Sequence, residues 1–232
     1  MSPDGRQPAH AKRLPREVRE RQILDAAVTV FSRRGYHEAS MDEISEVAGV
    51  SKPMLYTYFG SKENLFTACI RREATLMLEA VASGVKPGPT PDVQLWQGLL
   101  AFFRFVARNR DSWRVLHRQI IAQGGPFATE VAQFRQRAIR LVATLVARGG
   151  TSAGVESAER YAEGLAAGLV GAAESVADWW LDQPQLPPES IAAQLMNLTW
   201  LGFGDLVAGR AWVPPDDQPP DDQPPDDEQP DT

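Results

Sequence analysis

Residues 40–60 read SMDEISEVAGVSKPMLYTYFG and contain the start and stop signals of two short helices. Ser40 stands three residues before a glutamate, the capping-box spacing that begins a helix, and Gly49 is placed to end that helix. Ser51 can cap a second helix with Pro53 in its first turn, where the missing N–H costs nothing. The segment therefore predicts a short helix, a tight glycine-containing turn and another short helix.

Longer helices are expected on both sides of this segment. Within residues 16–34, apolar side chains recur at i, i+3, i+4, i+7 and i+8, which is one stripe of an amphipathic helix that Gly35 would end. Ser61 can cap a further helix from about residue 62 to 83. The two short helices would pack between these longer ones.

The two short helices each have one apolar face. Ile44, Val47 and Ala48 give the first helix its buried side, and Leu55 lies on the inward face of the second. This core would hold the helices at a steep angle, which is the helix-turn-helix plan, and would leave one face of the second helix free for the DNA major groove. The candidate DNA-binding residues are Ser40, Ser51, Lys52, Pro53, Met54, Tyr56, Thr57, Tyr58 and Lys62.

The charge of the chain is unevenly distributed. The formal net charge of the 232 residues is −6, which by itself argues weakly against a polyanionic partner. Residues 1–72 carry 12 Lys and Arg against 9 Asp and Glu, whereas residues 214–232 carry 8 acidic residues and no basic one. The negative charge belongs to the C-terminal tail, and the N-terminal part remains compatible with DNA.

Both ends of the chain are predicted to be disordered. The tail at 213–232 is built on a Pro-Pro-Asp-Asp-Gln repeat with almost no apolar side chains, so it cannot bury enough surface to offset its ordering entropy. It is either a solubilising tail or a DNA mimic that competes for the basic head. Residues 1–15 predict a flexible arm, in which Arg6, Lys12 and Arg13 could contact phosphates or a minor groove, or an untethered terminus.

The stretch 48–65, AGVSKPMLYTYFGSKENL, resembles the N-terminal domain of TetR/AcrR-family regulators, particularly actinobacterial ones, over about residues 17–77. The resemblance implies an all-α protein of about nine helices that forms homodimers. It implies an N-terminal three-helix helix-turn-helix DNA-binding domain at 16–77, with the helix-turn-helix at 40–59, and a C-terminal helical ligand-binding and dimerisation domain at 78–212.

The resemblance also implies roles for individual residues. The family residue matching Lys52 contacts DNA at the start of the recognition helix, and the one matching Lys62 pairs with a phosphate. Those matching Tyr56 and Tyr58 touch the DNA backbone. Pro53 replaces a frequent glycine and Tyr58 a frequent histidine, so base preference stays open. The implied function is a transcriptional repressor that a small apolar effector releases from a palindromic operator in double-stranded DNA.

The second half of the chain is rich in aromatic residues at helical spacing. They suit the lining of a pocket for a large apolar effector, although such residues are more often simply core. The candidate pocket residues are Phe102, Phe103, Trp113, His117, Phe127, Phe134 and Trp179. Arginines at 104, 108, 110, 114 and 118 could meet a phosphorylated ligand such as an acyl-CoA, or form a solvated face.

Glycines interrupt the last two helices expected, at 161–181 and 190–208. Each costs about 1 kcal/mol of helix stability against alanine, which a close helix–helix approach would offset. We expect these helices to form the dimer interface, with intrachain packing as the alternative. The candidate interface residues are Gly164, Gly168, Gly171, Trp180, Leu195, Leu198 and Gly202.

Other classes of function find no support in the sequence. A single cysteine, Cys69, and three scattered histidines argue against disulfides and a metal site, and neither a cofactor nor a catalytic residue is expected. Nucleophile-elbow, phosphate-loop and zinc-protease motifs are missing. The longest uncharged stretch, 190–204, is shorter than the roughly 20 residues of a membrane span, so we expect a cytoplasmic, nucleoid-associated protein without membrane contact. A regulator with no small-molecule ligand, and an enzyme or carrier with a DNA-binding-like head, are the alternatives.

Overall fold

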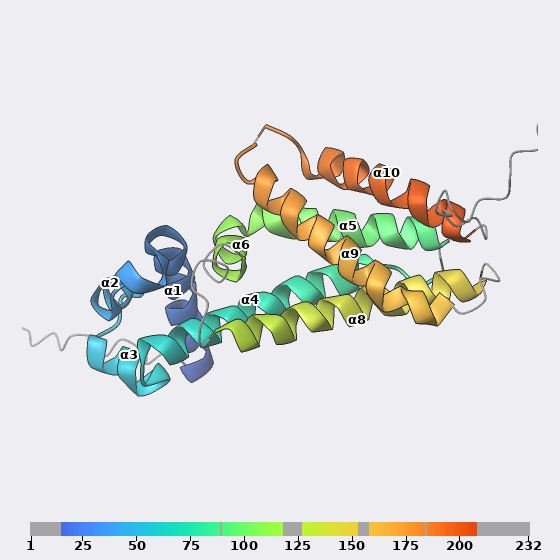
Figure 1. Ribbon diagram of the computed structural model, residues 1–232. Helices are drawn as coiled ribbons and strands as arrows, with labels where there is room; N and C mark the ends of the chain where they lie inside the picture. Colours follow the sequence, from blue (N-terminus) through green and yellow to red (C-terminus); the bar gives the residue numbers. More distant parts are fainter. Residues whose placement is uncertain (1–14, 89, 118–126, 153–157, 184, 208–232) are drawn as a thin grey trace, which may run out of the picture.

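The computed structural model describes residues 15–88, 90–117, 127–152, 158–183 and 185–207, and within these ranges it contains helices and no strand (Figure 1). The helices are α1 (Arg16–Glu38), α2 (Met41–Val47), α3 (Lys52–Phe59), α4 (Lys62–Gly84), α5 (Pro91–Arg108), α6 (Arg110–Leu116), α8 (Ala128–Ser152), α9 (Ala158–Trp180) and α10 (Pro188–Val207). The predicted all-α fold is confirmed. The acidic tail at 213–232 and nearly all of the N-terminal arm lie outside the described residues.

Serine caps begin the three helices that follow α1. The Ser40 hydroxyl accepts the backbone N–H of Glu43 at 3.0 Å, and Ser51 accepts that of Met54 at 3.3 Å. Ser61 accepts the N–H of the third residue of α4 at 3.0 Å. Each bond satisfies one of the donors that a helix N-terminus leaves open, so α2, α3 and α4 begin where the serines predict.

Glycines with positive φ change the chain direction on both sides of α2. Gly49 has φ of 61° in the turn before α3, and Gly35 has φ of 78° near the end of α1. The sequence predicts that α1 ends at Gly35, whereas the helix is broken there and one more turn continues to Glu38. This extra turn carries Tyr36, whose ring packs on Phe66 with 5.1 Å between ring centroids.

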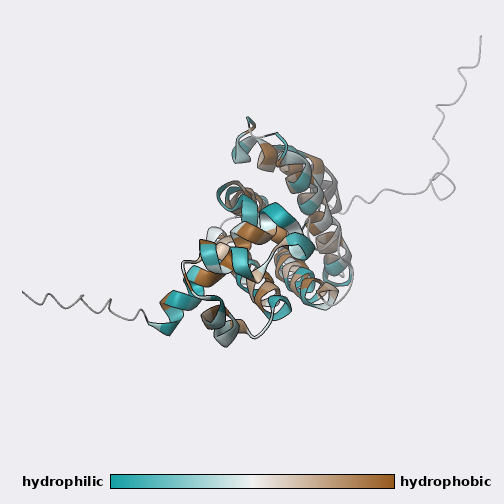
Figure 2. Cartoon of the chain, turned by 90° about the vertical axis from the view of Figure 1, so that its left-hand side faces the viewer, coloured by the Kyte–Doolittle hydropathy of each residue, from teal (hydrophilic) through white to brown (hydrophobic). Residues whose placement is uncertain are grey.

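The buried side chains of the described residues form two hydrophobic cores. The first core lies among α1, α2, α3 and α4, and its most buried side chains include Ile23, Ala27, Phe31, Ile44, Leu55, Leu65 and Phe66. The second joins α5, α6, α9 and α10, and includes Phe103, Val106, Trp113, Trp180, Ile191 and Leu195. Figure 2, which faces the α1–α3 end, shows hydrophilic and hydrophobic residues alternating along the helices, as amphipathic packing requires.

Helix α4 belongs to both cores. Its first half buries Leu65, Phe66 and Ile70 in the first core, and its second half places Met77 in the second. Figure 1 shows α4 running from α3 toward α5, with α8 alongside it. The Arg71 guanidinium also donates to Glu130 of α8, with 3.0 Å between Nε and Oε2. One rigid helix therefore connects the two ends of the molecule.

Phe127, just before α8, inserts into the first core rather than the second. Its ring lies 4.8 Å from those of both Tyr36 and Phe66, edge-on in each case, and the side chain is 4% exposed. Val115 and Leu116 of α6 are buried in the same core. Residues from the second half of the chain thus complete the core beneath the short helices.

Replacing Phe127 by alanine should lower the free energy of unfolding by about 3–5 kcal/mol, because it removes a buried aromatic ring and leaves a cavity. Urea denaturation followed by circular dichroism measures this loss. Leu76→Ala, at a site 45% exposed on α4, is the matched control and should cost far less. Equal losses for the two variants would contradict the anchoring role of Phe127.

Candidate DNA-binding surface and ligand cavity

Helix α3 exposes most of its side chains. Leu55 is its one fully buried residue, whereas Lys52, Pro53 and Thr57 are exposed. Met54 and Tyr56 are 37% and 42% exposed, and Tyr58 is half-buried with the Arg16 guanidinium 5.4 Å from its ring centroid. Leu55 anchors α3 together with the half-buried Tyr58 and Phe59, which pack against the first core. The open side of the helix is suited to enter a groove of DNA. The structure brings the predicted residues of α3 together on this surface.

The two capping serines lie at the edges of the same surface. Ser40 and Ser51 are exposed, and each hydroxyl oxygen accepts a backbone N–H. Because a hydroxyl also carries one donor, each serine can still donate to a phosphate oxygen.

Lys52 forms an ion pair that the sequence does not indicate. Its Nζ lies 2.8 Å from Oδ1 and 2.9 Å from Oδ2 of Asp42, in the first turn of α2. This hydrogen bond raises the pKa of Lys52 above its ordinary value. The two residues are ten apart in sequence, so only the turn between α2 and α3 brings them into contact.

Lys62 is partly buried against the end of α1. Its Nζ donates to the His37 carbonyl at 3.0 Å and lies 4.8 Å from the centroid of the Tyr36 ring. Burial lowers the pKa of Lys62 below its ordinary value. The ammonium group has three donors, so Lys62 can hold the last turn of α1 and still donate to a phosphate.

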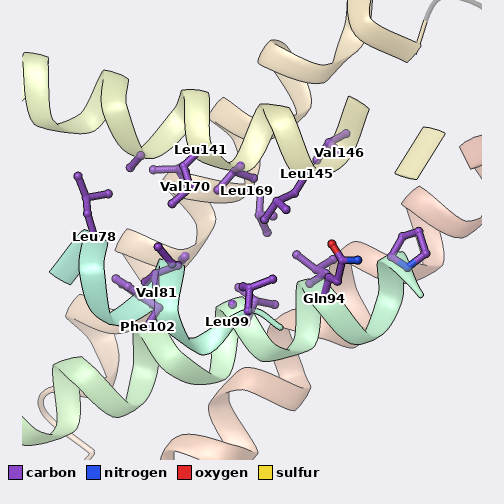
Figure 3. Close-up of a pocket in the computed structure, with 18 of the residues that line it drawn as sticks. Leu78, Val81, Gln94, Leu99, Phe102, Leu141, Leu145, Val146, Leu169 and Val170 are labelled. Carbon is purple, nitrogen blue, oxygen red and sulfur yellow. The ribbon is translucent and has the colours of Figure 1, made fainter. Parts of the chain in front are cut away.

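A largely apolar cavity of about 340 Å³ lies between α4, α5, α8 and α9 (Figure 3). Leu78 and Val81 of α4 face Leu141 and Leu145 of α8 across it. Of the seven predicted pocket residues, Phe102 and Phe134 line it. The other lining residues include Met77, Val85, Lys86, Gln94, Leu99, Val146, Arg148, Leu169, Val170, Glu174 and Trp200.

The five remaining predicted pocket residues lie elsewhere. Phe103 is fully buried beside Trp180, and Trp113 is buried with the His117 ring stacked 5.0 Å away. Phe127 belongs to the first core, and Trp179 is 52% exposed. Helical spacing identifies the buried face of a helix, but not which neighbour that face meets. The aliphatic wall from α4 and α8 was missed because a stripe of leucines and valines looks the same in a core and in a cavity.

The predicted interface residues of α9 and α10 divide into two groups. Gly164 and Gly168 are exposed, a Cβ on either would meet no atom within 4 Å, and Leu198 is 71% exposed. Trp180 and Leu195 are buried in the chain's own second core.

Gly171 also lies within the chain's own packing, since a Cβ there would be 3.2 Å from Nη2 of Arg135. Gly202 lies within α10, and its surroundings are outside what the structure describes.

Two family models match the chain. The model described as "Bacterial regulatory proteins, tetR family" matches residues 23–69, which span the helix-turn-helix, and the model described as "Tetracyclin repressor-like, C-terminal domain" matches residues 91–202. The HTH-type transcriptional activator FasR of Mycolicibacterium smegmatis is 31% identical over 201 residues, covering 86% of this chain and 89% of FasR. These matches define the class as helix-turn-helix regulators of transcription.

Solved structures show the same relationship. A TetR-like transcriptional regulator from Rhodococcus sp. RHA1 is 44% identical, with a TM-score of 0.69 over 83% of this chain and 99% of that one. FadR of Bacillus subtilis, solved in complex with stearoyl-CoA, shares the fold at 19% identity, with a TM-score of 0.67 over 77% of this chain and 96% of its own.

The chain belongs to the TetR family and is a DNA-binding transcriptional regulator. Its relatives are regulators of transcription rather than enzymes. In the part of the chain that the structure describes, no helix is both long and apolar enough to cross a bilayer.

Replacing Lys62 by methionine should weaken binding to all DNA sequences alike and lower the salt slope of binding by about 1, because one phosphate contact is lost while the aliphatic stem is kept. Fluorescence anisotropy at several salt concentrations measures both. Lys86→Met, which removes an exposed lysine far along the chain, is the control. An unchanged salt slope for Lys62→Met would show that this lysine has only a structural role.

Proposed function

We propose that the protein is a homodimeric repressor that leaves a palindromic operator when an effector with a long apolar chain fills the cavity. The observation that carries this proposal is the double role of α4, which lines the cavity with Met77, Leu78 and Val81 and begins at Lys62 beside the exposed helix α3. A ligand that moves the cavity end of this helix also moves the DNA-binding end.

The domain division follows from the same helix. We assign residues 16–77 to the DNA-binding domain, with the helix-turn-helix at 40–59, and residues 78–212 to ligand binding and dimerisation. Two α3 helices related by a two-fold axis would read half-sites about 34 Å apart, or at a multiple of that spacing. An effector that binds better when the two DNA-binding domains are at a different spacing lowers the affinity for DNA. By reciprocity, DNA lowers the affinity for the effector by the same coupling free energy.

The chemistry of the cavity supports an acyl chain with an anionic head group. Its volume falls within the range of about 300–1,000 Å³ typical of small-molecule sites, and its walls are mainly aliphatic. Lys86 and Arg148 add two exposed cations to the lining, whereas Glu174 pairs with Arg135, with 3.0 Å between Oε2 and Nε. The B. subtilis FadR structure, with the same fold, holds stearoyl-CoA.

The exposed faces of α9 and α10 support the dimer. Tyr161, Trp179 and Leu198 are 55%, 52% and 71% exposed, which is unusual for large apolar side chains on one pair of helices. Gly164 and Gly168 lie on α9 between the two aromatic residues and present open backbone. A second copy packed on this surface would bury the apolar side chains and permit close helix contact.

Two experiments separate this proposal from its alternatives. The first experiment identifies the operator from the genomic DNA fragments that the protein binds, and then measures whether stearoyl-CoA, stearate or free CoA, each added separately, releases the protein from that operator. If none of the three releases it, a regulator without this ligand is favoured. FasR is named an activator, so a promoter fusion in a deletion strain tests the sign of control. Raised expression on deletion supports repression, and lowered expression contradicts it.

Replacing Leu145 by tryptophan should abolish release by the acyl ligand, because the larger side chain takes up the space that the acyl chain would fill. Anisotropy titrations with and without stearoyl-CoA measure this. Leu76→Trp, outside the cavity lining, should retain the response. Retained release in Leu145→Trp would place the ligand elsewhere.

The double substitution Gly168→Glu with Leu198→Glu should convert the dimer to monomers and weaken operator binding at least tenfold, since charges would be buried at the interface without partners. Sedimentation velocity at micromolar concentration gives the oligomeric state. Val93→Glu, at another exposed apolar position on α5, is the control. A monomeric unsubstituted protein, or a dimeric double variant, would refute this interface.

A further inference from the structure

We infer that Asp42 is a specificity-determining residue, and that its carboxylate and the Lys52 ammonium together read one G·C base pair in the major groove of each half-site. The inference rests on the proposed placement of α3 in the major groove. It goes beyond that placement because it assigns an acidic base-reading residue on α2, outside the recognition helix.

The geometry joins the two side chains into one unit. Lys52 Nζ lies within 2.9 Å of both carboxylate oxygens of Asp42, and the side chains remain 48% and 70% exposed. Neither group is enclosed by the protein, so both can take a further partner from outside.

The backbone places this ion pair at the DNA-facing end of the helix-turn-helix. Asp42 is the second residue of α2, just after the Ser40 cap, and Lys52 is the first residue of α3 after the Ser51 cap. The Ser45 hydroxyl also donates to the Asp42 carbonyl at 2.8 Å, which holds the first turn of α2. The N-terminal residues of a recognition helix are those that meet base edges, so a carboxylate bound to Lys52 lies at the same level.

The charge of Asp42 restricts what it can contact. An ionised carboxylate is only an acceptor of hydrogen bonds, and it is repelled by phosphates. In the major groove, DNA offers N–H donors at cytosine N4 and adenine N6, and Asp characteristically accepts from cytosine. Asp42 therefore weakens binding to every sequence except those that present such a donor next to it.

The donors and acceptors of the ion pair complement a G·C edge. Lysine has three donors; two directed at the Asp42 oxygens leave one for O6 or N7 of guanine, the usual base partner of lysine. The carboxylate keeps free lone pairs for N4 of the paired cytosine. Guanine acceptors and the cytosine donor lie side by side in the major groove, so one ammonium and the carboxylate bound to it can meet both.

The same helix supplies a matched control. Glu46 is exposed on α2, and its side chain forms none of the contacts that Asp42 forms with Lys52. Glu43 is less suitable, because its carboxylate pairs with Arg34, with 3.3 Å between Oε1 and Nε. Asp42→Ala and Glu46→Ala remove the same charge from the same helix, and only the first disrupts the pair.

The test is selection of bound sequences from a randomised DNA library by the full-length protein and by both variants. The unsubstituted protein should enrich G·C at one position in each half-site. Asp42→Ala should reduce discrimination at that position by about tenfold or more and leave the other positions unchanged, whereas Glu46→Ala should leave all preferences unchanged. Thermal melting of each variant, with Asp42→Asn as an isosteric second substitution, verifies that the fold is retained.

Other outcomes would overturn the inference. If Asp42→Ala and Glu46→Ala raise affinity for every sequence by the same factor, Asp42 acts only through its charge. The inference is also overturned if no position is enriched in G·C, or if the enriched position is unchanged by Asp42→Ala. If Lys52→Ala binds the operator as tightly as the unsubstituted protein, the proposed placement of α3 in the major groove is wrong. That result would reject the proposed DNA interface as a whole and not only the role of Asp42.

Discussion

The burial of α4 in two separate hydrophobic cores is the constraint on which the rest of the structure depends. Leu65, Phe66 and Ile70 lie in the core beneath the helix-turn-helix, and Met77 lies in the core of the second half. Since close-packed cores transmit displacements rather than absorb them, the two ends of α4 move together. The position of α3 is therefore tied to whatever occupies the space between α4 and α8.

The head of the molecule is not self-sufficient. Phe127 packs edge-on against both Tyr36 and Phe66, and α6 contributes Val115 and Leu116 to the same core. The ring of Tyr36 also contacts a predicted DNA-binding residue, because the Lys62 ammonium lies over it. Packing at the start of α8 thus reaches a predicted phosphate contact through a single aromatic side chain.

Local signals in the sequence were sufficient for the head and insufficient for the cavity. Ser40, Ser51 and Gly49 act through bonds within three or four residues or through their own φ, so the caps and turn could be predicted from the chain alone. Periodicity was less dependable: Val47 was expected in the core and is 54% exposed. The face of a two-turn helix is poorly defined by three apolar residues.

Contacts between distant residues explain the other differences. The Lys52–Asp42 pair depends on the angle between two helices, and the cavity on how α4, α5, α8 and α9 cross, neither of which spacing encodes.

The distribution of charge on the head has a consequence for recognition. Lys52 and Arg34 point toward the surface of the helix-turn-helix, yet each is paired with a carboxylate of α2, Asp42 or Glu43. Exposed ion pairs of this kind contribute little to stability, so opening or sharing them costs little. A surface whose lysines and arginines are paired with carboxylates attracts phosphate less strongly than one on which the same cations are unpaired. Affinity for DNA in general is then reduced, and binding depends more on the base edges that complement α3 and the first turn of α2.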